Sequence, residues 1–160
     1  MTAAPPSLTL LTHSADETEA VGARLARSLP SRAAEPAVVY LSGELGAGKT
    51  TLARGFMRAR GVSGAIKSPT YTLIECHQTG PLVIVHLDLY RLQGPADLEG
   101  LGLRDLMQPG HLWLIEWPER GAGRLPAADV QAVLTVAADH HRVEISAASA
   151  FGREWLAGSG

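Results

Sequence analysis

Residues 43–50 read Gly-Glu-Leu-Gly-Ala-Gly-Lys-Thr, which fits the pattern G-x-x-x-x-G-K-[ST] at every fixed position. The glycines of such a segment let the backbone turn tightly, so that successive N–H groups point inward and form an anion-binding nest. Lys49 then supplies a point charge for the β- and γ-phosphates, and the Thr50 hydroxyl is placed to ligate Mg²⁺. The segment therefore predicts a phosphate-binding loop, or P-loop, for a nucleoside triphosphate.

The residues on both sides of this loop have the pattern that it requires. An apolar, partly β-branched run over 37–41 predicts a buried strand, and apolar residues at helical spacing follow over 51–59. A helix that begins at the loop adds partial positive charge beneath the phosphates. The chain has two lysines against twelve arginines, and a lysine kept at position 49 indicates a need for an ammonium group there.

The composition narrows the class of protein. A chain of 160 residues predicts one domain over 1–160, with an ordered core over about 8–156 and frayed ends. A net charge of −2 gives no basic surface for direct binding of nucleic acid. The single cysteine, Cys76, fits a reducing compartment, and neither a membrane span nor a signal peptide is evident. We therefore expect a cytoplasmic protein with no membrane partner.

The order of the expected elements predicts an α/β protein with a P-loop NTPase fold. Its central sheet should be mixed and mostly parallel, with antiparallel hairpins and with helices on both faces. Six of the expected strands are residues 8–12, 37–41, 82–87, 112–115, 130–136 and 142–146. A further strand is expected within 67–74, where a turn runs into it. The expected helices are 14–29, begun by a capping box at Ser14, then 51–59, an interrupted one at 95–106, and a short or irregular one at 150–156.

A P-loop also requires a carboxylate at the end of a neighbouring apolar strand, to position Mg²⁺ or the attacking water. Two residues fit this description, because Asp88 follows the apolar run 83–87 and Glu116 follows the run 112–115. The pattern does not decide between them. Both carboxylates can lie near the γ-phosphate, one on the metal and one orienting water.

Other candidate motifs are weaker. Residues 97–100 match D-x-x-G, but no strand precedes them. The sequence also contains no guanine-reading [NT]-K-x-D motif and no asparagine, which argues against a GTPase. We expect His86 to be a core histidine or one that supports another residue, and His140 and His141 to lie in a solvated turn. Trp117 is a candidate for the lining of the nucleotide site.

Four segments together resemble the TsaE family, the small bacterial ATPases (formerly YjeE) of tRNA threonylcarbamoyladenosine biosynthesis. They are residues 43–51, 67–73 (Lys-Ser-Pro-Thr-Tyr-Thr-Leu), 86–92 (His-Leu-Asp-Leu-Tyr-Arg-Leu) and 115–118 (Ile-Glu-Trp-Pro). The similarity runs from about residue 8 to residue 145. The combination is far more specific than the P-loop alone.

The resemblance implies an ATPase, slow by itself, that supports turnover of a TsaD–TsaB transferase assembly. That assembly attaches a threonylcarbamoyl group to the adenosine following the anticodon, so tRNA would be met only indirectly, through the complex. The implied cofactors are ATP and Mg²⁺. The alternative is a small-molecule kinase of the shikimate- or nucleoside-kinase type, although no arginine-rich lid segment stands between residues 92 and 112.

The resemblance also implies roles for individual residues. Thr50 and Glu116 would bind Mg²⁺, and Asp88 would be the catalytic or water-positioning acid beside Lys49. Thr70 would act as a nucleotide-sensing switch. The residues implied to hold the phosphates are Leu45, Gly46, Ala47, Gly48, Lys49, Thr50 and Thr51. Those implied to touch the base or ribose are Ser14, Ala15 and Arg142.

Overall fold

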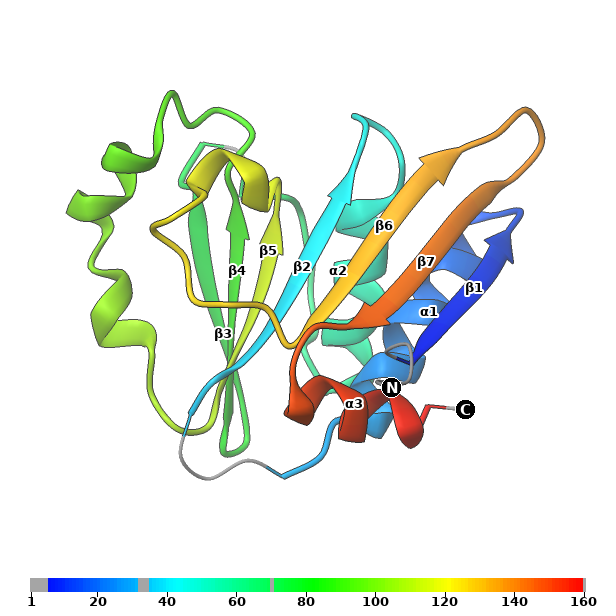
Figure 1. Ribbon diagram of the computed structural model, residues 1–160, viewed down its shortest axis with the longest axis horizontal. Coiled ribbons are helices and arrows are strands. Elements are labelled where there is room, and N and C mark those ends of the chain that lie inside the picture. The colour runs from blue at the N-terminus through cyan, green and yellow to red at the C-terminus, as the bar shows by residue number, and fades with distance from the viewer. Residues whose placement is uncertain (1–5, 32–34, 70, 160) are drawn as a thin grey trace, which may run out of the picture.

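A sheet of seven strands runs through the molecule in the computed structural model (Figure 1). The structure describes residues 6–31, 35–69 and 71–159. The strands are β1 Ser7–Thr12, β2 Ala37–Gly43, β3 Ile74–Thr79, β4 Leu82–Asp88, β5 His111–Glu116, β6 Val130–Val136 and β7 His141–Ala147. The α-helices are α1 Ala15–Ser28, α2 Lys49–Ala59 and α3 Ala150–Ala157, and the 3₁₀ helices are η1 Pro95–Leu101, η2 Leu103–Leu106 and η3 Pro118–Gly121.

The strand order is β1-β7-β6-β2-β5-β4-β3. β2 pairs in parallel with β5 and β6, and β5 pairs in parallel with β4. The remaining pairs, β1–β7, β6–β7 and β3–β4, are antiparallel. The strands β1, β2, β4, β5 and β6 therefore share one direction, which confirms the predicted mixed, mostly parallel sheet. The β3–β4 and β6–β7 hairpins are also confirmed.

The two faces of the sheet are covered differently. Val39 and Leu41 of β2 lie in the core that includes α1, α2 and α3, whereas Val38 lies in a second core with Leu98 of η1. Helices therefore cover both faces, as predicted, but those on one face are α-helices and those on the other are 3₁₀ helices. Over β6 and β7 the second face is open, because Gln131, Val133 and Arg142 are exposed there.

Helix α1 is held close to α2, and this contact brings its N-terminus to the P-loop. A Cβ at Gly22 would lie 2.0 Å from the carbonyl oxygen of Leu52, and one at Gly55 would lie 1.9 Å from that of Glu19. Only glycine allows backbones to approach so closely. The predicted capping is also present, because the N–H of Glu17 donates to Ser14 Oγ over 3.1 Å.

Two boundaries differ from the sequence expectation. β3 begins only at Ile74, because the preceding Leu73 takes a left-handed conformation (φ 66°) and its N–H donates to the Pro69 carbonyl in a turn. The helix expected over 95–106 is two 3₁₀ helices, separated at Gly102, where φ is 68°. The terminal segment is helical, with Ser149 capping α3.

Candidate functional site

The P-loop joins the end of β2 to the start of α2, as its sequence predicts. Gly48 has φ 106°, a left-handed conformation that strains residues bearing a Cβ. Helix α2 begins at the next residue, Lys49, so its unpaired N–H groups open toward the loop. The loop therefore has the backbone form of an anion-binding nest at a helix N-terminus.

Lys49 is folded back into the loop. Its side chain is buried, with 4% of the residue exposed, and Nζ donates to the carbonyls of Gly43 over 2.7 Å and Glu44 over 2.8 Å. The same nitrogen lies 4.2 Å from the centre of the Trp117 ring. Burial lowers the pKa of Lys49, while the charges of Glu116, Asp88 and Glu119 act in the opposite direction. The ammonium is thus poorly solvated and ready to interact with an anion.

Glu116 links the P-loop helix to the end of β5. Its Oε1 accepts a hydrogen bond from the Thr50 hydroxyl over 2.7 Å, and its Oε2 lies 2.6 Å from Nε2 of His86. The residue is only 2% exposed. The predicted metal pair, Thr50 and Glu116, is therefore brought into direct contact.

Asp88 stands beside Glu116, since the two residues are register partners in the parallel pair β4–β5. Its Oδ1 accepts from the N–H of Tyr90 over 3.0 Å, and its Oδ2 accepts from the Ser68 hydroxyl. Both acids are almost fully buried at the same edge of the sheet. They have different partners, which gives each a distinct orientation.

These groups line one cavity of about 420 Å³. Its walls are formed by Leu45, Gly46, Gly48, Lys49, Thr50, Thr51, Ser68, Asp88, Tyr90, Arg91, Glu116 and Trp117. We call it the phosphate cavity. Of the predicted phosphate-binding residues, Ala47 is absent from the wall, because its side chain is buried in the core. Ser68, Tyr90 and Arg91 were not among the expected site residues, although they lie within the segments 67–73 and 86–92 that carry the family resemblance.

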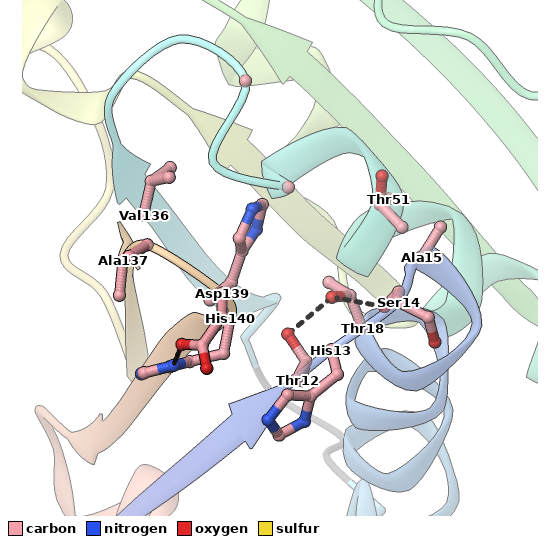
Figure 2. Close-up of a pocket in the computed structure, with 14 residues that line it drawn as sticks. Thr12, His13, Ser14, Ala15, Thr18, Thr51, Val136, Ala137, Asp139 and His140 are labelled. Atoms are coloured by element: carbon pink, nitrogen blue, oxygen red, sulfur yellow. Dashed lines mark hydrogen bonds and ion pairs between the residues drawn. The ribbon is translucent and has the colours of Figure 1, made fainter.

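A second cavity, of about 480 Å³, lies against the other side of the P-loop (Figure 2). We call it the outer cavity. Its walls are Thr12, His13, Ser14, Ala15, Thr18, Gly46, Gly48, Thr51 and residues 136–141. It shares Gly46, Gly48 and Thr51 with the phosphate cavity, so the P-loop separates the two. Ser14 and Ala15, implied by the family resemblance to touch the base or ribose, lie in this wall.

His141 is a site residue that the sequence analysis missed. Its Nδ1 lies 2.9 Å from the carbonyl oxygen of Ala47, so this nitrogen carries the proton and donates to the P-loop. The expectation of a solvated turn is wrong for His141, which is half-buried at the start of β7. No spacing in the sequence signals this contact. His140 does lie in the connection, where its Nδ1 is 2.7 Å from Asp139 Oδ1 and lowers the pKa of that carboxyl.

Arg142, also implied to touch the base or ribose, does not line either cavity. Arg142 forms an ion pair of 2.8 Å with Glu144, and its exposed side chain lies on the opposite face of β7 from His141. A contact between Arg142 and the base or ribose therefore stays a prediction that this arrangement does not support. Thr70, the expected switch, lies outside the described residues.

The described part of the chain sets two further limits. It contains no cluster of three or more His, Cys, Asp or Glu side chains able to hold a metal ion. Among the same residues, no helix has the length and apolar character needed to cross a membrane.

Comparison with known proteins points to a single family. The family described as "Threonylcarbamoyl adenosine biosynthesis protein TsaE" matches residues 12–145. The tRNA threonylcarbamoyladenosine biosynthesis protein TsaE of Haemophilus influenzae is 45% identical over 116 residues, 72% of this chain and 73% of the relative. The protein of the same name from Bacillus subtilis is 36% identical over 66% of this chain and 65% of its own length. The crystal structure of Bacillus subtilis YdiB matches the fold with a TM-score of 0.73 at 26% identity, covering 99% of this chain and 97% of that one.

Proposed function

This chain belongs to the TsaE family, which is named for the biosynthesis of threonylcarbamoyladenosine in tRNA, and we propose that within this process it binds ATP with Mg²⁺ and hydrolyses it. One observation carries the proposal. Lys49, Thr50, Asp88 and Glu116, from three different elements, converge on the phosphate cavity. A purely structural role for the P-loop would not require two buried acids beside a buried lysine.

The nucleotide would bind across the P-loop. Residues 45–51 would hold the phosphates through backbone N–H groups and Lys49, and the base and ribose would lie toward the outer cavity beside Ser14 and Ala15. Oxygen donors are the ligands that Mg²⁺ prefers, and the Thr50 hydroxyl and Glu116 carboxylate supply them. With no three-ligand cluster among the described side chains, phosphate oxygens and water would complete the coordination.

The chain's own groups support hydrolysis of the γ-phosphate. Asp88 is held by Ser68 and the N–H of Tyr90, and its free lone pairs would orient a water and accept its proton as the water oxygen bonds to phosphorus. The bond to the β,γ-bridging oxygen breaks, giving ADP and phosphate. Lys49 would exchange its carbonyl partners for phosphate oxygens and stabilise the charge that builds there. The bound Mg²⁺ would neutralise charge on the phosphates.

Several observations support an accessory ATPase over a small-molecule kinase. The relatives carry the name of a tRNA modification protein. The segment 93–111 contains one arginine, Arg104, which lines a separate cavity with Leu98 and Met107 rather than the phosphate cavity. A kinase lid would bring arginines over the phosphates.

Exposed apolar groups around the phosphate cavity support a role for partner proteins. Leu45 is 69% exposed and Tyr71 is 85% exposed, and the Arg91 guanidinium lies 4.6 Å from the centre of the Tyr71 ring. We propose TsaD-like and TsaB-like proteins as partners, tRNA as an indirect one, and the cytoplasm as the location. Thr70, next to Tyr71 in sequence, stays our predicted switch.

Steady-state ATP hydrolysis tests the proposal. The protein alone should turn over ATP slowly, and addition of TsaD with TsaB should raise the rate. The same assay with shikimate and nucleosides as acceptors tests the kinase. Full activity without partners, together with phosphate transfer to an acceptor, would refute the accessory role.

A further inference from the structure

His86 lies on β4, between β5 and the edge strand β3, and contacts Glu116 of the phosphate cavity. It belongs to β4, two residues before Asp88, and is 0% exposed. Along a strand, alternate residues share a face, so His86 shares its face with Ile84 and Asp88. Its register partner on β5 is Leu114, two residues before Glu116. No wall of the phosphate cavity includes His86, so it does not contact what binds there.

The hydrogen bonds of His86 define its tautomer. Its Nε2 lies 2.6 Å from Oε2 of Glu116, whereas its Nδ1 is buried with no hydrogen-bond partner among the described residues. A proton on Nδ1 would leave a buried donor unsatisfied, which is costly. The carboxylate oxygen of Glu116 is an acceptor, so the 2.6 Å contact requires a proton on Nε2. The arrangement that satisfies the site has a proton on Nε2, which donates to the Glu116 carboxylate.

We propose that His86 is a positioning residue for the metal site, which directs the Glu116 carboxylate by donating one hydrogen bond to its Oε2. The inference rests on the proposed function of Glu116 as a ligand of Mg²⁺. Oε1 already accepts from Thr50, so the two donors together fix the plane of the carboxylate. Groups that hydrogen-bond to metal-ligating carboxylates orient them and sustain metal affinity.

The size of the effect follows from the burial of Glu116. At 2% exposure the carboxylate has little access to water, so His86 cannot be replaced by solvent when it is removed. Loss of His86 should therefore leave the Glu116 carboxylate misdirected, and the metal should bind more weakly. Binding of the nucleotide phosphates to the P-loop should change little.

A Mg²⁺ titration of nucleotide binding tests this role. With a fluorescent ADP analogue, His86→Leu should raise the Mg²⁺ concentration for half-maximal binding by about tenfold or more. Metal-free affinity should stay within about twofold of the wild type. His86→Gln, whose amide nitrogen occupies a place similar to Nε2, should recover most of the loss.

The matched control is His77→Leu. His77 lies on β3 opposite Ile84, on the same face of the sheet. Its Nε2 is 3.7 Å from Oε2 of Glu75 and has no hydrogen-bond partner, Glu116 included, in the part of the chain that the structure describes. It removes the same chemical group one strand away. An equal shift in Mg²⁺ dependence for His77→Leu and His86→Leu, or no rescue by His86→Gln, would overturn the proposal.

The tautomer gives a second readout that needs no nucleotide. Long-range ¹H–¹⁵N correlation of the wild-type histidines should show His86 protonated on Nε2 and bare on Nδ1, and Glu116→Gln should shift the Nε2 signal. A proton on Nδ1 would overturn the proposal, even if His86→Leu fails to fold. If the wild type binds no nucleotide while the tautomer is as expected, the proposed function fails and the hydrogen bond to Glu116 stands.

Discussion

The two cavities beside the P-loop differ in how far their polar side chains are buried and in the partners to which these side chains are hydrogen-bonded. In the phosphate cavity, Lys49, Asp88 and Glu116 are almost fully buried and are hydrogen-bonded to groups from β4, α2, the P-loop itself and the loop before β3. In the outer cavity, His13 and Asp139 are exposed, and the hydrogen bonds of Asp139 and His140 join neighbours in sequence. The outer cavity reaches the P-loop through one described side-chain hydrogen bond, from His141 to Ala47.

This difference indicates how the two sides would act. Buried groups that are hydrogen-bonded to one another are held in a fixed arrangement. Phosphate transfer requires such an arrangement, because the catalytic groups must be positioned before the reaction. A surface of exposed groups with local partners contributes contact but little fixed charge, because water screens it. We therefore expect substitutions on the phosphate side to abolish turnover, and those on the outer side to weaken binding modestly.

The largest effect should come from Lys49→Ala. The Lys49 ammonium would contact the phosphates of a nucleotide held by the P-loop, and its loss should lower kcat/KM for ATP by about a thousandfold or more. The matched control is Lys67→Ala, which removes the chain's other lysine at an exposed position. Circular dichroism checks that the fold is intact. Unchanged hydrolysis in a folded Lys49→Ala would break the comparison, because the phosphate cavity would then hold no essential charge.

The next effect separates the two acids. Asp88→Asn should keep nucleotide affinity and lower kcat by about a hundredfold, because the amide still accepts from Tyr90 but cannot take a proton from water. Single-turnover hydrolysis and equilibrium nucleotide binding measure the two quantities separately.

Glu116→Gln is the partner variant. It should raise the Mg²⁺ requirement, while hydrolysis at saturating Mg²⁺ falls less than in Asp88→Asn. The reverse pattern would show that Glu116 orients the water and Asp88 holds the metal.

A smaller effect tests the outer side. His141→Ala removes the hydrogen bond to the Ala47 carbonyl, a loss of about 1 kcal/mol that corresponds to roughly a fivefold rise in Kd for ATP. His140→Ala is the control, since His140 bonds to Asp139 rather than to the P-loop. Equal affinities for the two variants would mean that the contact with Ala47 does not shape the loop.

The smallest effect is a pH dependence of stability. Burial lowers the pKa of Lys49 in the folded protein below its usual 10.5. At pH values between the lowered pKa and 10.5, Lys49 therefore keeps its proton in the unfolded chain and has lost it in the folded protein. Stability rises with pH where the unfolded state binds more protons. Wild type should therefore gain stability relative to Lys49→Met as pH rises through that interval. Urea unfolding at a series of pH values measures the free energy of unfolding of each variant. If this free energy changed with pH equally in the wild type and in Lys49→Met, as we expect for the wild type and Lys67→Met, the prediction would be contradicted.

The fold and the phosphate side follow closely from sequence patterns. The P-loop, the strands that end in Asp88 and Glu116, and the helix start at Ser14 all lie where they are predicted. Each depends on residues that are adjacent in the chain, so that periodicity and capping reveal them. The expectation that His86 is a core histidine is likewise confirmed by its burial.

One wrong expectation, a solvated turn for His141, falls at the β6–β7 connection. His141 and Arg142 are adjacent, and adjacent residues of a strand point to opposite faces of the sheet. A shift of one position therefore exchanges which residue meets the P-loop. The β6–β7 pairing fixes this choice by placing His141 opposite Val136, and no local pattern in residues 137–142 shows it.

The sequence by itself determined that this chain has a P-loop with a lysine, a hydroxyl and two acids at strand ends, because each of these features is written in a short contiguous run. Only the tertiary structure decided how they meet. Parallel pairing of β4 with β5 sets Asp88 beside Glu116 and brings His86 to its carboxylate. The close packing of α1 on α2 sets Ser14 against the P-loop. Contacts between residues far apart in the chain depend on the register of paired strands and on how closely two backbones approach each other. Neither produces a periodic pattern in the sequence.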